Sequence, residues 1–112
     1  MSREALGEFE QLVLLALVRL ADDGYGVSIH GEIAHRTRRH VSLAAVYKTL
    51  DRLEQKGFAA SWLGDATRER GGRRKKHFRI QPAGRRVLKA SLASIGRMAD
   101  GLAGNPAFDI EP

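Results

Sequence analysis

The segment SLAAVYKTLDRLEQKG, residues 42–57, decides the fold of this chain. Its apolar residues follow the spacing of an amphipathic helix and form one stripe: Leu43, Val46, Leu50 and Leu53. Ser42 suits the N-cap of this helix, and Gly57 suits the left-handed position after its end. The opposite side is small or polar: Ala44, Ala45, Tyr47, Lys48, Asp51, Arg52 and Gln55. We therefore expect a helix with one buried and one exposed side.

Two further helices are predicted before this segment. The first covers residues 9–20 and has a second apolar face that includes Leu14, Leu15 and Val18. A helix that is apolar on both sides in so short a chain should pack on its own core and on a second subunit. The second helix follows the polar turn at residues 21–25 and has isoleucines one turn apart on its inner face.

Two strands and a last helix are predicted after the central helix. Residues 58–63 have aromatic and apolar residues at alternate positions, as do residues 75–80, so both segments are predicted to be strands. The long polar connection between them, which contains glycines, should make them a β-hairpin. Pro82 suits the first turn of a helix whose apolar residues repeat at the spacing of a helix that packs on a partner helix. The predicted dimer surface combines the first and last helices: Phe9, Leu14, Leu15, Val18, Leu88, Leu92, Ile95, Ala99 and Leu102.

This order of elements predicts a mainly α-helical fold with a small β-hairpin (α+β). Three helices followed by a two-stranded wing are typical of a winged helix-turn-helix. We expect a DNA-binding domain over residues 5–80, a C-terminal dimerisation helix over residues 81–102, and a flexible tail over residues 103–112.

The excess positive charge lies in one segment, residues 68–79. It contains seven Arg or Lys residues and one Glu, a net charge of +6, which equals the net charge of the whole chain. A chain that concentrates its charge imbalance at the tip of a hairpin is expected to contact a polyanion there.

Double-stranded DNA is the polyanion that fits both the helix and the hairpin. In a winged helix-turn-helix the third helix enters the major groove and the wing lies along phosphates or in the adjacent minor groove. The residues predicted to contact DNA are Tyr25, Ser42, Ala44, Ala45, Tyr47, Lys48, Arg52, Arg70, Gly71, Gly72, Arg73, Arg74, Lys75 and Lys76. Two alternatives stay open: Tyr47 packs on the wing, and Arg52 pairs with Asp51 or Gln55.

Other function classes lack support in the sequence. The chain has no cysteine, no Gly-x-Ser-x-Gly, no phosphate-binding glycine loop and no His-Glu-x-x-His, so no catalytic residue and no cofactor is predicted. His30, His35 and His40 recur at every fifth position, which spreads them around a helix, so no metal site is predicted either. An RNA-binding module or a protein-interaction module on the same scaffold remains the alternative.

The N-terminal part of the sequence predicts a soluble cytoplasmic protein. Glu4, Glu8 and Glu10 are acidic, and no cleavable signal pattern is present. The longest apolar run, residues 12–18, is too short to span a bilayer.

Three motifs carry a resemblance to a known family. AVYKTLDRLEQKGF, residues 45–58, resembles the TLYPALKRLEREGLV segment of the PadR family of bacterial transcriptional regulators. GGRRKKHFRIQPAG, residues 71–84, resembles that family's GGRRRKYYRLTEAG, and GYG at residues 24–26 matches its HGYEI turn into the second helix. Two positions depart from the pattern: Lys48 stands where the family commonly has proline, and Gln81 replaces the usual threonine cap.

The resemblance, which covers roughly residues 12–92, implies a homodimeric bacterial repressor of the short type with a single C-terminal dimerisation helix. That helix would cross to the first helix of the partner, and the dimer would prefer an inverted repeat. Some members release DNA when a small molecule binds against a tryptophan, but Trp62 lies on a wing strand here and is expected to pack there. The sequence leaves open the operator, the regulated genes, an effector, and repression versus activation.

Overall fold

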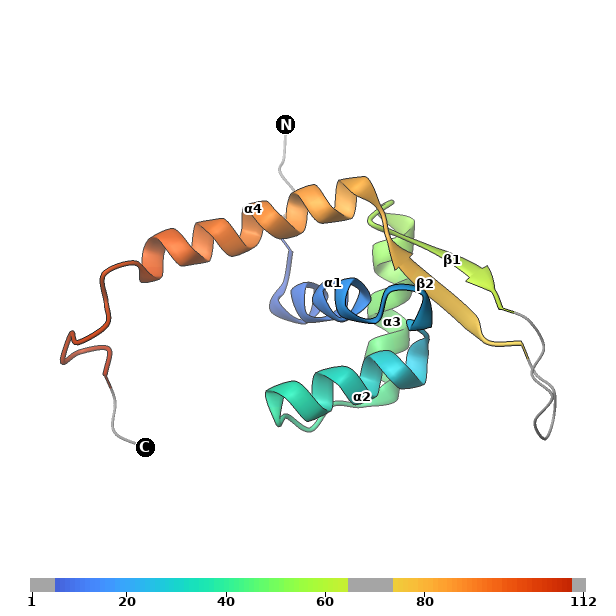
Figure 1. Cartoon of the computed structure of the whole chain (residues 1–112), viewed down its shortest axis with the longest axis horizontal. Coiled ribbons are helices and arrows are strands. Elements are labelled where there is room, and N and C mark those ends of the chain that lie inside the picture. The colour runs from blue at the N-terminus through green and yellow to red at the C-terminus, as the bar shows by residue number, and fades with distance from the viewer. Residues whose placement is uncertain (1–5, 65–73, 110–112) are drawn as a thin grey trace.

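The computed structural model describes residues 6–64 and 74–109, and its elements follow the predicted order. Their bounds are α1 Glu8–Leu20, the 3₁₀ turn η1 Ala21–Asp23, α2 Gly26–Thr37, α3 Leu43–Gln55, β1 Ala59–Leu63, β2 Lys76–Ile80 and α4 Pro82–Ala99. Helices α1 to α3 pack together, the hairpin extends from one side, and α4 passes over α1 and projects beyond it (Figure 1). The predicted class, helices with one antiparallel hairpin, is confirmed.

Helix α3 has the buried and exposed sides that its sequence predicts. Val46, Leu50 and Leu53 are fully buried. The Ser42 hydroxyl accepts a hydrogen bond from the Ala45 N–H at 3.0 Å, which satisfies a backbone donor that the helix itself cannot. Leu43 differs from the prediction: it is 38% exposed, because it occupies the first helical position, at the outer end of the stripe.

Gly57 ends this helix as predicted, with a φ of 78° that favours glycine. The chain then turns directly into β1, because the Phe58 N–H donates to the Leu53 carbonyl at 2.9 Å.

One apolar core joins the helices and the hairpin, and it includes two residues that the sequence assigned to a dimer surface. Leu14 is fully buried and Leu88 is 4% exposed. Helix α1 packs against α2, α3, α4 and β2. These neighbours cover more of the helix surface than is usual for a surface helix, so Leu14 is buried as well. Leu88 lies on the part of α4 that rests on the core. Both side chains belong to the core of their own chain.

The hairpin is antiparallel, and its register pairs Ala59 with Ile80 and Leu63 with Lys76. Each strand begins one residue later than predicted. The turn before α2 also lies along β2, where the Phe78 N–H donates to the Gly24 carbonyl at 2.8 Å. This contact, which no local sequence pattern predicts, fixes the hairpin to the helices.

Helix α4 rests on the core with its first half only. The residues from Leu92 to the end of the helix are exposed, and the helix ends at Ala99, three residues earlier than predicted. Gly84 allows the close approach of α4 to the hairpin, because a Cβ at this position would collide with the Phe58 carbonyl. The following residues form turns, in which the Asn105 N–H donates to the Leu102 carbonyl at 2.9 Å. No helix in the two described ranges is long and apolar enough to cross a membrane.

A buried carboxylate ties α1 to α3. Glu10 accepts hydrogen bonds from the Gly7 N–H at 2.9 Å and from Lys56 Nζ at 3.0 Å, and Arg52 Nε lies 3.3 Å away. Burial acts to raise the pKa of the Glu10 carboxyl, but the Gly7 N–H, the Lys56 hydrogen bond and the charges of Lys56 and Arg52 outweigh it. The net result is a pKa below the ordinary value.

We expect Glu10→Gln to lower the free energy of unfolding at neutral pH by about 1–2 kcal/mol, because Arg52 is half exposed and water screens part of the pairing. Since folding lowers this pKa, the stabilisation is complete above pH 4.5 and is lost as the pH falls through the folded-state value. Denaturant unfolding at several pH values measures the difference. Glu8→Gln is the control, because the Glu8–Arg39 pair is exposed and should change stability by less than about 0.5 kcal/mol. Equal effects of the two variants would contradict the role of Glu10.

Candidate nucleic-acid interface

The outward face of α3 presents one line of side chains. Ala44, Lys48, Asp51 and Gln55 follow one another at spacings of 4, 3 and 4 residues, and all four are exposed. They lie opposite the buried stripe, so the packing of the core alone turns them outward. Within residues 6–64 and 74–109, Lys48 forms no ion pair, and its ammonium group is available to an anionic partner.

Arg52 lies at the edge of this face. Its partner is neither of the two residues that the sequence suggested. Its guanidinium pairs with Glu10 of α1, and neither Asp51 nor Gln55 holds it. The pairing turns Arg52 toward the body of the protein, so Lys48 is the better-placed cation of α3 for contact with a ligand.

Tyr47 is 45% exposed, and its ring lies against the first turn of α2. A Cβ at Gly26 would collide with the Tyr47 ring, so the glycine provides the space in which the ring sits. The sequence alternative had placed Tyr47 against the wing, whereas the structure places it against α2. The importance of Gly26 was missed, because no local pattern shows that a residue 21 positions away packs on it.

A ladder of cations and rings forms the base of the wing, which we define as β1, β2 and their connection. Lys75 Nζ lies 4.3 Å from the centre of the Tyr25 ring, and the Tyr25 and His77 ring centres are 5.5 Å apart. His77 stacks on Trp62 at 5.3 Å, and the Arg79 guanidinium lies 4.7 Å from the Trp62 ring. Cation–π and aromatic contacts of this kind each contribute about 0.5–1.5 kcal/mol. The ladder holds the wing against the turn into α2, and Trp62 packs within the wing.

Two further contacts join the wing to its surroundings. Arg79 pairs with Asp22 at 2.7 Å, and the His77 Nδ1–H donates to the Asp22 carbonyl at 2.9 Å. Lys76 Nζ lies 3.8 Å from a carboxylate oxygen of Glu54 in α3. The wing is therefore attached both to η1 and to α3.

The described part of the predicted basic segment is on the surface. Arg74, Lys75 and Lys76 are exposed, whereas Arg70, Gly71, Gly72 and Arg73 lie outside the described residues. Tyr25 is half-buried beneath Lys75, Ser42 caps α3, and Ala45 is partly buried beside the outward line. The structure therefore places the α2 turn, α3 and the described part of the wing in contact with one another. Exposed cations next to an exposed helix face can bind the phosphates of a polyanion and leave the helix free to contact its bases.

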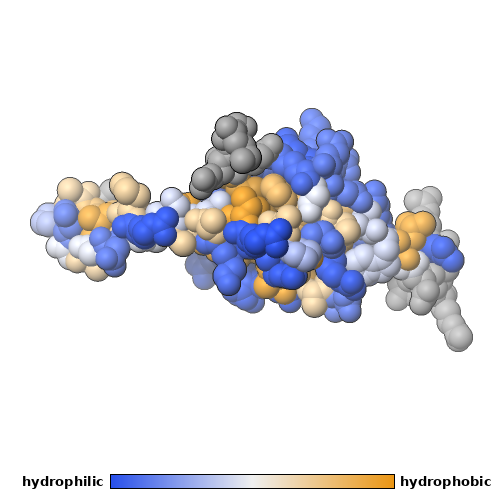
Figure 2. Space-filling model, turned by 90° about the horizontal axis from the view of Figure 1, so that it is seen from above, coloured by the Kyte–Doolittle hydropathy of each residue, from blue (hydrophilic) through white to orange (hydrophobic). Residues whose placement is uncertain are grey.

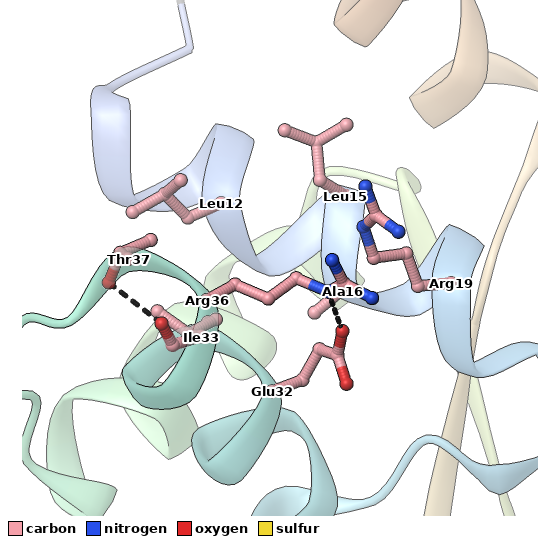
Figure 3. A pocket seen from close by; sticks show the side chains of 8 residues that line it. All are labelled: Leu12, Leu15, Ala16, Arg19, Glu32, Ile33, Arg36 and Thr37. Atoms are coloured by element: carbon pink, nitrogen blue, oxygen red, sulfur yellow. Dashed lines mark hydrogen bonds and ion pairs between the residues drawn. The ribbon is translucent and has the colours of Figure 1, made fainter.

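A separate apolar pocket lies between α1 and α2 and uses no residue of α3 or the wing (Figure 3). Its volume is about 190 Å³, and its lining is Leu12, Leu15, Ala16, Arg19, Glu32, Ile33, Arg36 and Thr37. Arg36 pairs with Glu32 at its rim, and the Thr37 hydroxyl donates to the Ile33 carbonyl at 2.7 Å. In the part of the chain that the structure describes, no three His, Asp or Glu residues could hold a metal ion.

Comparisons with known proteins agree with this geometry. Residues 14–90 match the sequence model of the transcriptional regulator PadR-like family. A PadR family transcriptional regulator from Eggerthella lenta is 25% identical, with a TM-score of 0.67, over 91% of this chain and 88% of that one. A transcriptional regulator from Clostridium thermocellum is 22% identical, with a TM-score of 0.69, over 87% and 88% of the two chains.

A PadR-like transcriptional regulator from Bacillus cereus is 18% identical, with a TM-score of 0.70, over 91% of this chain and 93% of that one. No curated protein sequence matches the chain.

We expect Gly26→Ala to destabilise the protein by about 1 kcal/mol, because the added methyl group displaces the Tyr47 ring from α2. In a Tyr47→Ala background the same change should cost little, since alanine is the better helix former once the ring is gone. Thermal unfolding of the four proteins in this double-mutant cycle measures the coupling between the two positions. Equal costs of Gly26→Ala in both backgrounds would show that the contact contributes nothing.

Proposed function

Because the chain belongs to the transcriptional regulator PadR-like family, we propose that it binds specific DNA sequences and represses transcription as a homodimer. The observation that carries this proposal is the exposed outward face of α3 together with the exposed cations that directly precede β2, a strand that the Lys76–Glu54 pair connects to α3. Lys48, Arg74 and Lys75 have no acidic partner among the described residues. A polyanion can therefore bind these cations without first breaking an internal ion pair.

The two parts of this surface suit different parts of a duplex. The outward line of α3 would enter the major groove, where small Ala44 permits close approach and Lys48 can donate to guanine or phosphate. Arg74 and Lys75 would lie along the adjacent phosphates and gain affinity through the release of counterions. The ladder at the base of the wing favours this mode, because it holds the wing against the turn into α2 before DNA arrives.

The second half of α4 supports the homodimer. It carries exposed apolar residues along one side, with Leu92 41%, Ile95 57% and Met98 81% exposed. Val18 adds an exposed apolar side chain on α1, which lies beneath α4. Figure 2 shows apolar patches over the body and on the projecting end, with hydrophilic side chains between them. We propose that this side of α4 packs on α1 and α4 of a second copy, since exposed apolar side chains that gather on one side of a helix mark an interaction surface.

A homodimer of this kind would present two α3 helices to one duplex. Its two-fold symmetry favours an inverted repeat with half-sites about one helical turn apart, and occupancy of such a site near a promoter would block transcription. The protein would act in the bacterial cytoplasm, where the DNA lies, and not as an enzyme. A small-molecule effector stays a prediction.

An RNA-binding role is the alternative, and the wing argues against it. RNA readers of single strands stack bases on exposed aromatic rings. Trp62 already stacks on His77 and lies under the Arg79 guanidinium, so its ring is engaged within the protein.

We expect the double variant Arg74→Ala/Lys75→Ala to bind all duplexes about tenfold more weakly at moderate salt, because two phosphate contacts are lost. The slope of log K against log salt should fall by about 2 in magnitude. Fluorescence anisotropy at several salt concentrations measures both quantities. Arg85→Ala/Lys89→Ala on α4 is the control that removes the same charge from exposed positions outside α3 and the wing. Similar losses in both variants would remove the wing from the interface.

We expect Leu92→Glu/Ile95→Glu to yield monomers that bind an inverted repeat at least about tenfold more weakly, because buried unpaired carboxylates oppose the dimer contact. Light scattering and anisotropy measure the two effects. The control Ala90→Glu/Ala93→Glu places the same charges on the opposite side of α4 and should leave the dimer intact. A dimer that persists in the first variant would show that α4 does not hold the subunits together.

A further inference from the structure

Asp51 is an acidic residue on the surface proposed to face DNA. It lies on the outward line of α3 between Lys48 and Gln55, and its side chain is exposed. Within residues 6–64 and 74–109 its carboxylate forms no hydrogen bond and no ion pair, although Lys48 precedes it by one turn. Nothing in the described protein therefore neutralises this charge.

Three other acids, one each in α1, α3 and η1, are held by the protein itself. Each has a cation or a hydroxyl as its partner: Glu10 has Lys56 and Arg52, Glu54 has Ser61 and Lys76, and Asp22 has Arg79. Their charges are thus compensated before any ligand binds. Asp51 differs from them, and it sits at the centre of the face rather than at its edge.

A carboxylate in this position is unfavourable for general attraction to DNA, because it repels the phosphates that the wing attracts. It becomes favourable only where the duplex offers a hydrogen-bond donor, since an ionised carboxylate only accepts. In the major groove those donors are the exocyclic amino groups of cytosine and adenine. The adenine amino group lies beside the N7 acceptor, which would face the same carboxylate, whereas the cytosine edge has no such acceptor.

From this position and this chemistry we propose that Asp51 is a specificity-determining residue that accepts a hydrogen bond from a cytosine amino group in the major groove. It strengthens binding to half-sites with cytosine at that position and weakens binding to all other sequences. The inference rests on the proposed function, because it takes the outward face of α3 to be the DNA-contacting face.

The test is selection of bound duplexes from a randomised pool, with the wild-type protein, Asp51→Ala and Asp51→Asn. The wild type should enrich cytosine at one position of each half-site. Asp51→Ala should lose the preference at that position alone, with about a tenfold loss of discrimination, and should bind a shuffled duplex about two- to fivefold more tightly. Asp51→Asn should move the preference toward adenine, because an amide both accepts from the adenine amino group and donates to N7.

Asp100→Ala is the matched control, because it also removes one exposed carboxylate but lies at the end of α4. It should leave the enriched sequence unchanged. An unchanged preference at every position in Asp51→Ala would overturn the inference while leaving the proposed function in place. A preference for adenine in the wild type that depends on Asp51 would overturn the assignment to cytosine. If the wild type enriches no sequence, the proposed function itself fails, and this inference fails with it.

Discussion

The burial of one side of α3 is the constraint on which the rest of the structure depends. Val46, Leu50 and Leu53 are fully buried against the other helices, which fixes the rotation of α3 about its own axis. Rotation of the helix would expose this stripe at a cost of several kcal/mol. Lys48 and Asp51 are therefore held outward by packing elsewhere in the molecule, and no local interaction is needed to orient them. A rigid helix face of this kind is what direct reading of a duplex requires.

The wing depends on the same core packing indirectly, through β2. Phe78 of β2 is buried in the core, and its N–H is bonded to the turn before α2, so the hairpin cannot move freely relative to α3. Neighbouring cations would repel one another on a free loop, but here each has a stabilising contact. The Lys75 ammonium lies over the Tyr25 ring, and the Lys76 ammonium lies beside the Glu54 carboxylate. Part of the cost of ordering the interface is thus met during folding, before any ligand binds.

The sequence predicted the elements and their order because periodicity, caps and turn residues are local properties. Ser42 and Gly57 delimit α3 as expected. Sequence reasoning failed where the outcome depended on contacts between distant segments. It assigned Leu14 to the dimer surface, because it could not show that α2, α3, α4 and β2 all pack on α1, and it did not find Glu10 as the partner of Arg52. The contact between Gly26 and Tyr47 was invisible for the same reason. The directions of the side chains on α3 were predictable. The ion pair with Glu10 that engages Arg52, while Lys48 has no acidic partner among the described residues, was not.

The most direct test of the central claim, that α3 and the wing form one DNA-binding surface, is the change in backbone amide NMR shifts when an enriched duplex is added. We expect the largest changes at Lys48, Asp51 and Gln55 and at Arg74 to Lys76. Changes around the α1–α2 pocket, which shares no residue with that surface, should be small. Large changes in the pocket residues with an unaffected α3 would show instead that DNA binds a different face of the protein.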